Sequence, residues 1–169
     1  MVSLNTDEKY YMNDDFVLFK SGIPSQWYES PFVIDGEEYV NCEQRMMKMK
    51  ALTFGDAEVA EEVMKTTDPK RHKELGRAVK NFDAVVWAEK AYAVVVEANY
   101  AKFSQNAELC EYLRSTGDRK FVECAPYDKI WGNGLNITDT LATAESDWPG
   151  TNLLGKAIME VRARLFDEI

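Results

Sequence analysis

An acid and a large aromatic ring occur together in a stretch shaped by proline and glycine. Residues 125–135 contain Pro126, Asp128, Trp131 and Gly132. Proline restricts the backbone, whereas glycine permits positive φ or the close approach of a ligand. A carboxyl group can transfer a proton or orient water, and an indole ring can stack on a base or a sugar. The stretch therefore predicts either a ligand-binding loop or a turn around a buried tryptophan.

A second acid shares a predicted helix face with an amine. Residues 41–54 are typical of a helix capped by Asn41, and at about 100° per residue Glu43 and Lys50 fall on one apolar stripe. They lie about 10 Å apart along the axis, so each is expected to meet another group. Two interpretations are open: the two side chains lie at the edge of the stripe and extend their charges into water, or they line a pocket. Burial would lower the pKa of Lys50 and make its neutral amine nucleophilic, although a nearby carboxylate would oppose that change.

Four further positions are candidates for binding. Gln26 and Trp27 lie in a loop, where they either bind a planar ligand or fill the core. Trp87 lies on a long alanine-rich helix and is either a core residue or part of a pocket. At the expected start of the last helix, near Asn152, free N–H groups would favour a phosphate.

Gly155 lies inside the first turns of that last helix, where glycine costs about 1 kcal/mol relative to alanine. Either a ligand approaches closely at this position, or another helix packs tightly there. The residues alone leave both interpretations open.

The hydrophobic pattern predicts an α+β fold that is predominantly helical, with a small sheet in a single compact domain. We expect a polar extension at residues 1–15 and the domain itself at 16–169. The connection at 136–150 is polar and acidic, and is a candidate lid or a passive surface loop. The predicted strands are residues 16–19 and 120–124 with a hairpin at 31–40, and the predicted helices are 41–54, 56–65, 68–79, 83–103, 106–115 and a last one from 151.

Composition excludes several classes of protein. The net charge of −9 argues against a general binder of nucleic acid or of anionic membranes, although a local positive pocket remains compatible with it. Three widely spaced cysteines and a polar start predict a reduced, cytoplasmic protein that neither spans nor binds a membrane. No protein partner is required by any motif.

Metal and cofactor chemistry have little support in the sequence. The single histidine, His72, lies in a charged run and is expected to be solvated rather than a metal ligand. No phosphate-binding glycine motif is present, so we expect no cofactor. Carboxylates and lysines must then carry any reaction.

Seven short motifs occur in an order that resembles the NADAR family, the YbiA-like N-glycosidases associated with NAD and ADP-ribose. The similarity extends from about residue 16 to 165, which makes the combined pattern specific. The motifs are Ser30-Pro31-Phe32 with Asp35-Gly36, Glu43 seven residues before Lys50, Leu75-Gly76-Arg77, Ala101-Lys102-Phe103-Ser104-Gln105, Asp128-x-x-Trp131-Gly132-x-Gly134-Leu135, Asn152-Leu153-Leu154-Gly155, and Met159-Glu160-Val161-Arg162.

The resemblance implies a small, mostly helical YbiA-like domain that hydrolyses an N-glycosidic bond. The bond would belong either to a ribosylamine phosphate of riboflavin synthesis or to ADP-ribose attached to guanine in nucleic acid. A non-catalytic reader of ADP-ribose is a third interpretation. The hypothesis assigns catalysis to Glu43, Asp128 and Lys50, and substrate binding to Gln26, Trp27, Trp87, Trp131, Gly132, Asn152 and Gly155, with no metal.

Three departures favour ADP-ribose over the riboflavin intermediates. Many members of the riboflavin-linked branch have Asn-Phe in place of Gln26-Trp27, and histidine in place of Gln44. The acidic connection at 136–150 is also absent from the pattern of that branch. The expected partner is therefore an ADP-ribosyl or ribosyl-phosphate substrate, with ADP-ribosylated nucleic acid held through a local pocket.

Overall fold

The chain divides into two units, each with its own contacts. A computed structural model describes residues 8–167. The terminal unit comprises residues 8–25 and 111–167, and the central unit comprises residues 26–110. The boundary falls within α5 (Ala107–Ser115). The predicted α+β, predominantly helical fold with a small sheet is confirmed, whereas a domain boundary after residue 15 stays a prediction.

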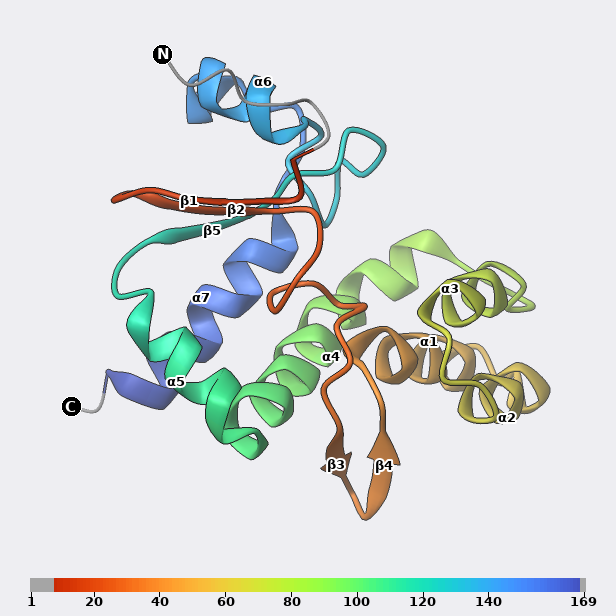
Figure 1. Ribbon diagram of the computed structural model, residues 1–169. Helices are drawn as coiled ribbons and strands as arrows, with labels where there is room; N and C mark the ends of the chain where they lie inside the picture. The colour runs from red at the N-terminus through yellow and green to blue at the C-terminus, as the bar shows by residue number, and fades with distance from the viewer. Residues whose placement is uncertain (1–7, 168–169) are drawn as a thin grey trace. The chain divides into compact units, whose positions relative to one another are not determined.

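Helices form most of the central unit, and side-chain caps set where they begin. Asn41, Asp56, Asp68 and Asp83 each accept a hydrogen bond from a backbone N–H in the first turn of the helix that follows. The sequence analysis predicted these starts. Helices α1, α2 and α3 pack against one another, and α1 also packs against α4 (Figure 1). The bounds are α1 Cys42–Thr53, α2 Ala57–Met64, α3 Pro69–Arg77 and α4 Ala84–Gln105.

A short hairpin leads into α1. Strands β3 (Phe32–Ile34) and β4 (Glu37–Tyr39) are antiparallel and turn at Asp35 and Gly36, whose φ angles are 53° and 78°. Positive φ at both positions fits the tight turn of a two-residue hairpin. The Gln105 side chain at the end of α4 makes two 2.8 Å hydrogen bonds, from the Val33 N–H and to the Val33 carbonyl. The hairpin is thereby tied to α4.

A three-stranded sheet organises the terminal unit. Its order is β1–β2–β5, formed by Tyr10–Met12, Phe16–Phe19 and Lys120–Glu123. Strand β1 is antiparallel to β2, whereas β2 and β5 are parallel. Helix α7 (Leu153–Phe166) packs on one face of this sheet and α6 (Ile137–Ala142) on the other (Figure 1). Strand β1 lies in the segment expected to be a polar extension, and it was not predicted.

The connection at 136–150 is not an irregular loop. Asn136 caps α6 through a hydrogen bond from the Asp139 N–H, and a single 3₁₀ turn follows at Glu145–Asp147. The Trp148 ring packs against the Phe16 ring, with their centroids 6.1 Å apart, and its Nε1–H donates to the Thr143 carbonyl. The segment therefore has regular structure, and both the lid role and the passive surface role stay predictions.

His72 is buried rather than solvated. It is 0% exposed, and its Nε2 lies 2.6 Å from the carbonyl oxygen of Thr66. Burial lowers the pKa of the imidazole, so the neutral ring is favoured. The expectation of a solvated histidine is therefore wrong, because His72 lies on the buried side of α3 together with Leu75 and Gly76.

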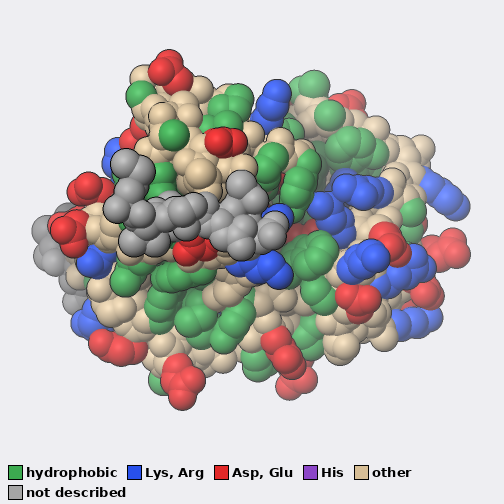
Figure 2. Space-filling view, turned by 45° about the horizontal axis from the view of Figure 1, so that its top comes forward, with side chains coloured by type: hydrophobic (Ala, Val, Ile, Leu, Met, Phe, Trp, Pro, Cys, Tyr) green, Lys and Arg blue, Asp and Glu red, His purple; other side chains and the backbone are tan. Residues whose placement is uncertain are grey.

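The surface carries both signs of charge. On the face drawn in Figure 2, Lys and Arg side chains are interspersed with Asp and Glu side chains. Among residues 8–167, no helix is long and apolar enough to cross a bilayer.

Candidate functional site

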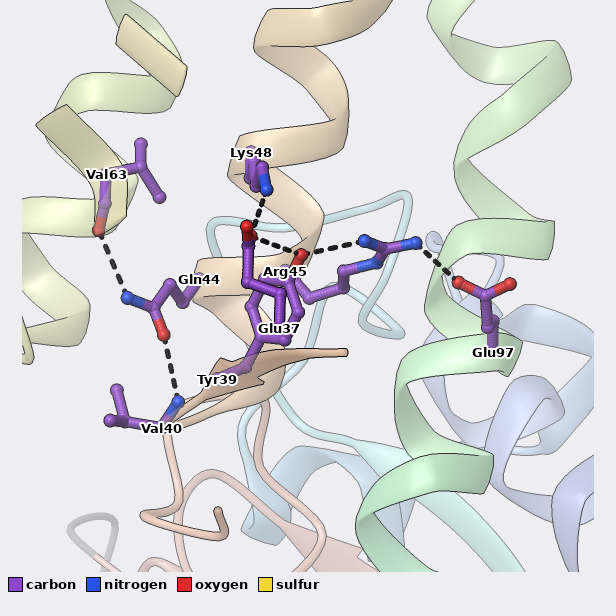
Figure 3. A network of polar contacts seen from close by, with 8 residues as sticks. All are labelled: Glu37, Tyr39, Val40, Gln44, Arg45, Lys48, Val63 and Glu97. Atoms are coloured by element: carbon purple, nitrogen blue, oxygen red, sulfur yellow. Dashed lines mark hydrogen bonds and ion pairs between the residues drawn. The ribbon is translucent and has the colours of Figure 1, made fainter. Parts of the chain in front are cut away.

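A network of polar side chains on one side of α1 fixes the rotation of that helix. The side-chain amide of Gln44 accepts from the Val40 N–H at 2.9 Å and donates to the Val63 carbonyl at 3.2 Å (Figure 3). Arg45 donates to the Tyr39 hydroxyl at 2.8 Å and to Glu97 at 2.7 Å. The network links α1 to β4, α2 and α4, and consequently sets the direction in which the opposite stripe of α1 faces.

Glu43 and Lys50 are electrostatically coupled on that opposite stripe. The Glu43 side chain is buried, and its backbone N–H donates to the Gln26 carbonyl at 3.1 Å. Burial lowers the pKa of Lys50, while the charge of Glu43 acts to raise it and that of Arg77 acts to lower it further. The sequence analysis predicted both the desolvation and the opposing carboxylate.

Two neighbours of Lys50 were missed by the sequence analysis. The Phe82 ring centroid lies 4.5 Å from Lys50 Nζ, and Phe82 packs edge-on against Phe54. Arg77 ends α3, which approaches α1 closely at Gly76: a Cβ there would lie 1.9 Å from Met47 Sδ. The glycine at position 76 could have indicated this close packing. The sequence of the loop that carries Phe82 contains no comparable indication that Phe82 contacts Lys50.

The two tryptophans proposed for binding in the central unit differ in exposure. Trp27 is 43% exposed and Trp87 is 8% exposed. The Lys73 ammonium lies 6.0 Å from the centroid of the Trp27 ring. A partly exposed ring can stack on a ligand, whereas the burial of Trp87 favours its core interpretation.

Asp128 organises its own loop. Its Oδ1 accepts hydrogen bonds from the Ile130 and Trp131 N–H groups, both at 2.9 Å. This is the local turn that aspartate side chains commonly make. The backbone of the half-buried Trp131 is therefore held by Asp128, a contact that was not predicted, and one carboxylate oxygen is already used within the loop.

The start of α7 does not offer the free N–H groups that were expected. The N–H groups of Asn152, Leu153 and Leu154 donate to carbonyls of the loop at residues 130–132, at 2.9 to 3.1 Å. The Asn152 side chain accepts from the Glu123 N–H and donates to the Phe121 carbonyl. Asn152 therefore joins the loop, α7 and β5, and the expectation of a phosphate cradle at residues 152–154 is wrong.

Close packing accounts for two glycines of the terminal unit. A Cβ at Gly155 would lie 2.0 Å from the Phe121 carbonyl oxygen, and one at Gly132 would lie 2.9 Å from the Asp128 carbonyl oxygen. Gly155 thus allows α7 to approach β5, so the packing interpretation holds, with a strand rather than a helix as the partner.

We expect Gly155→Ala to lower the free energy of unfolding by about 3 kcal/mol, because the new methyl group must displace backbone. Chemical denaturation of the variant and of Lys156→Ala, its exposed neighbour, measures this. Unchanged stability together with lost substrate binding would instead indicate contact between Gly155 and a ligand.

Lys102 is a buried amine in the core of the central unit. It is 0% exposed, and its Nζ lies 5.6 Å from the Tyr28 ring centroid and 5.1 Å from that of Phe103. Burial lowers the pKa of Lys102 from 10.5 to about 8, and raises that of the neighbouring Cys42 thiol to about 11. The motif containing Lys102 was noted in the sequence, but its burial was not.

Lys102→Met should raise the free energy of unfolding at pH 7 by up to about 3 kcal/mol, because the unfolded chain binds the lysine proton more tightly than the folded one. The gain should shrink as the pH rises above about 8, where the folded parent loses this proton, and should vanish only above 10.5, where the unfolded chain has lost it too. Urea unfolding at several pH values tests this, with Lys90→Met on the exposed side of α4 as control. A gain independent of pH would contradict the assignment.

The predicted site residues fall into both units. Gln26, Trp27, Glu43, Lys50 and Trp87 belong to the central unit. Asp128, Trp131, Gly132, Asn152 and Gly155 belong to the terminal unit. The predicted pairing of Glu43 with Asp128 stays a prediction.

The profile of the NADAR domain matches residues 5–166. The chain belongs to the NADAR domain family. It is 43% identical over 143 residues to N-glycosidase R617 of Acanthamoeba polyphaga mimivirus, with 82% of this chain and 84% of the relative covered. The NMR structure of Escherichia coli YbiA shares 27% identity and a TM-score of 0.73, covering 95% of this chain and 90% of YbiA.

A third relative carries a different name within the same family. The riboflavin biosynthesis protein VVA0006 of Vibrio vulnificus is 26% identical over 144 residues, which are 85% of this chain and 35% of that protein. With N-glycosidases among its relatives over most of its length, this NADAR protein is a hydrolase that acts on N-glycosyl bonds.

Proposed function

We propose that this NADAR protein removes ADP-ribose from guanine by hydrolysing the N-glycosidic bond between them, with Glu43 and Lys50 of α1 as its chemical groups. The observation that carries the proposal is the coupled pair itself. A buried carboxyl and an amine whose pKa is lowered by burial lie on one face of one helix. A lysine whose pKa is perturbed in this way, beside a buried carboxyl, is typical of catalytic sites.

The pair suits a reaction through an imine. Glu43 protonates the ring oxygen of the ribose, the ring opens, and the C1–N bond to the base becomes an iminium. The neutral Lys50 amine adds to C1, and the base leaves with a proton and the C–N electron pair. Water then hydrolyses the lysine imine, which returns the free amine and releases the sugar. The sum of these steps is the addition of one water across the bond.

Direct hydrolysis is the simpler alternative. In that route a carboxylate stabilises the cationic sugar and orients water, while Lys50 binds a phosphate or a sugar hydroxyl. Trapping of the imine, described in the Discussion, separates the two routes.

The neighbourhood of Glu43 supports guanine as the leaving base. Trp27 presents a partly exposed indole in the segment whose Gln26 carbonyl binds the Glu43 N–H. Such a ring provides a platform for a purine. Gln44, by contrast, lies in the structural network of Figure 3, so its departure from the riboflavin-linked pattern says little about the substrate.

Hydrolysis of a ribosylamine phosphate of riboflavin synthesis is a second candidate, supported by the name of the Vibrio vulnificus relative. The protein should be incubated in excess with ADP-ribosylated guanosine and, separately, with the ribosylamine phosphate. Release of guanosine with free ADP-ribose supports our proposal, and release from the ribosylamine alone supports the second candidate. Saturable binding without release of either would indicate a reader and contradict both.

A further inference from the structure

A chain of directed hydrogen bonds in the central unit determines which end of the Gln26 amide faces Asn99. It begins at the Val95 carbonyl, which accepts a 2.9 Å hydrogen bond from Asn99 Nδ2. A carbonyl oxygen can only accept, so the nitrogen of the Asn99 amide must lie on this side. The orientation of Asn99 thus follows from the chemistry of its partner.

The orientation of the Asn99 amide in turn fixes that of the Gln26 amide. The same Asn99 Nδ2 donates its second hydrogen to Gln26 Oε1 at 2.9 Å. The carbonyl end of the Gln26 amide is therefore turned towards α4, and the NH₂ end is turned away from Asn99. Gln26 Nε2 lies 4.0 Å from Met46 Sδ, which is a weak acceptor and takes at most one of the two hydrogens. One N–H of Gln26 remains available for a stronger acceptor.

This arrangement leaves one polar atom of Asn99 without a hydrogen bond within residues 8–167. The residue is 0% exposed, and its Oδ1 is buried with no hydrogen-bond partner among the described residues. Buried polar atoms are normally satisfied, so an exception requires a reason. An apolar side chain would fill this position on α4 without leaving an unpaired oxygen. The donor that Asn99 supplies to Gln26 is the feature that an apolar side chain would lack.

Gln26 is close to the chemical groups. Its backbone carbonyl binds the N–H of Glu43, and Trp27 follows it in the chain. An available N–H at this half-buried position complements a planar group with an acceptor on its edge. Guanine offers such an edge in the carbonyl oxygen on C6 and the adjacent N7.

We propose that Gln26 recognises the carbonyl oxygen on C6 of the leaving guanine by donating a hydrogen bond to it, and that Asn99 is the positioning residue that holds the amide in this orientation. The inference rests on the proposed function and names the part of the substrate that is read. A donated hydrogen bond to that oxygen also favours departure of the base, because it stabilises the electron density gained when the C–N bond breaks.

Two substrates that differ at C6 and N1 of the base test the inference. ADP-ribosylated guanosine has a carbonyl oxygen on C6 and hydrogen on N1, whereas the corresponding ADP-ribosylated 2-aminopurine riboside has hydrogen on C6 and none on N1. The parent should prefer the guanine substrate by about tenfold in kcat/KM, the effect of one well-placed hydrogen bond. The ratio of the two kcat/KM values is the measurement, because a change that only loosens the fold lowers both values alike.

Asn99→Asp should abolish the preference. Its carboxyl offers an acceptor towards Gln26, so the Gln26 amide must rotate to donate to it, which places the Gln26 oxygen where the NH₂ group lies in the parent. Gln26→Met, at a half-buried position, removes the donor and should bring the ratio within about twofold of one even if Asn99→Asp folds poorly. Asn106→Asp is the matched control, since that asparagine, at the C-cap of the same helix, donates to the Pro31 and Lys102 carbonyls and should keep the parent's ratio.

The outcomes separate the inference from the function on which it rests. Release of base from neither substrate by the parent overturns both. Equal release from the two substrates by the parent, or a preference that survives in Gln26→Met, overturns the inference and leaves the N-glycosidase proposal standing.

Discussion

Glu43→Gln is expected to lower kcat for release of the base by about 10² to 10⁴, the usual contribution of a general acid or base. Glutamine keeps the size and polarity of the buried side chain but cannot protonate the ribose ring oxygen. The Glu43 backbone N–H, which binds the Gln26 carbonyl at 3.1 Å, is unaffected by the substitution. The fold and the affinity for free ADP-ribose should therefore change little. Single-turnover measurement of base release, together with circular dichroism, tests both expectations.

Glu61→Gln on α2 is the matched control for this loss, because it removes a carboxylate from an exposed position of the same unit. Its kcat should stay within about twofold of the parent. If kcat of Glu43→Gln also stays within about twofold of the parent, Glu43 does not act as the general acid. A raised KM with unchanged kcat would make Glu43 a binding residue.

Lys50→Arg is expected to reduce kcat at least about a hundredfold, because a guanidinium keeps the positive charge but cannot form an imine. Borohydride added during turnover should leave a ribose-derived mass on the peptide of α1 in the parent and no mass in Lys50→Arg. Lys48→Arg, two residues away on the opposite side of α1 and paired with Glu37, is the control that should still be labelled at Lys50.

The pH dependence of this step follows from the environment of Lys50. Burial lowers the pKa of Lys50 below its ordinary 10.5, and only the neutral amine attacks, so the rate should rise with pH and level off below 10.5. Glu43 opposes that lowering. The rate at which an amine-reactive reagent acylates Lys50 should likewise rise with pH and then level off. In Glu43→Gln this plateau should begin at a lower pH than in the parent. Absence of the borohydride adduct, with Lys50→Arg retaining most activity, would contradict the imine and leave Lys50 as a binding charge.

Local patterns in the sequence were sufficient to predict the main helices and the shared helix face of Glu43 and Lys50. Side chains such as Asn41 and Asp83 accept hydrogen bonds from the first turns of α1 and α4, and this chemistry is encoded within three residues. The shared face of Glu43 and Lys50 follows from the helical period alone. The glycine at position 155 likewise marked a close approach, although its partner could not be named.

Contacts between segments that are distant in the sequence could not be predicted from local patterns. The first N–H groups of α7 are free in an isolated helix, but here they bind carbonyls about twenty residues earlier in the chain. His72 was misjudged because charged neighbours in sequence lie on the other face of a short helix. Phe82 meets Lys50 only because a loop between α3 and α4 brings it there. Each error concerns a partner that no local pattern specifies.

The parallel pairing of β2 with β5 has a consequence for how the protein is made. Phe16 lies opposite Lys120, so β2 must wait during synthesis until about a hundred further residues have left the ribosome. The central unit lies entirely within that interval and is rich in local helical contacts, which form fast. Its nascent chain can acquire structure while the apolar Phe16–Phe19 strand is still unpaired. That interval is when the polypeptide is most exposed to aggregation and most in need of a chaperone.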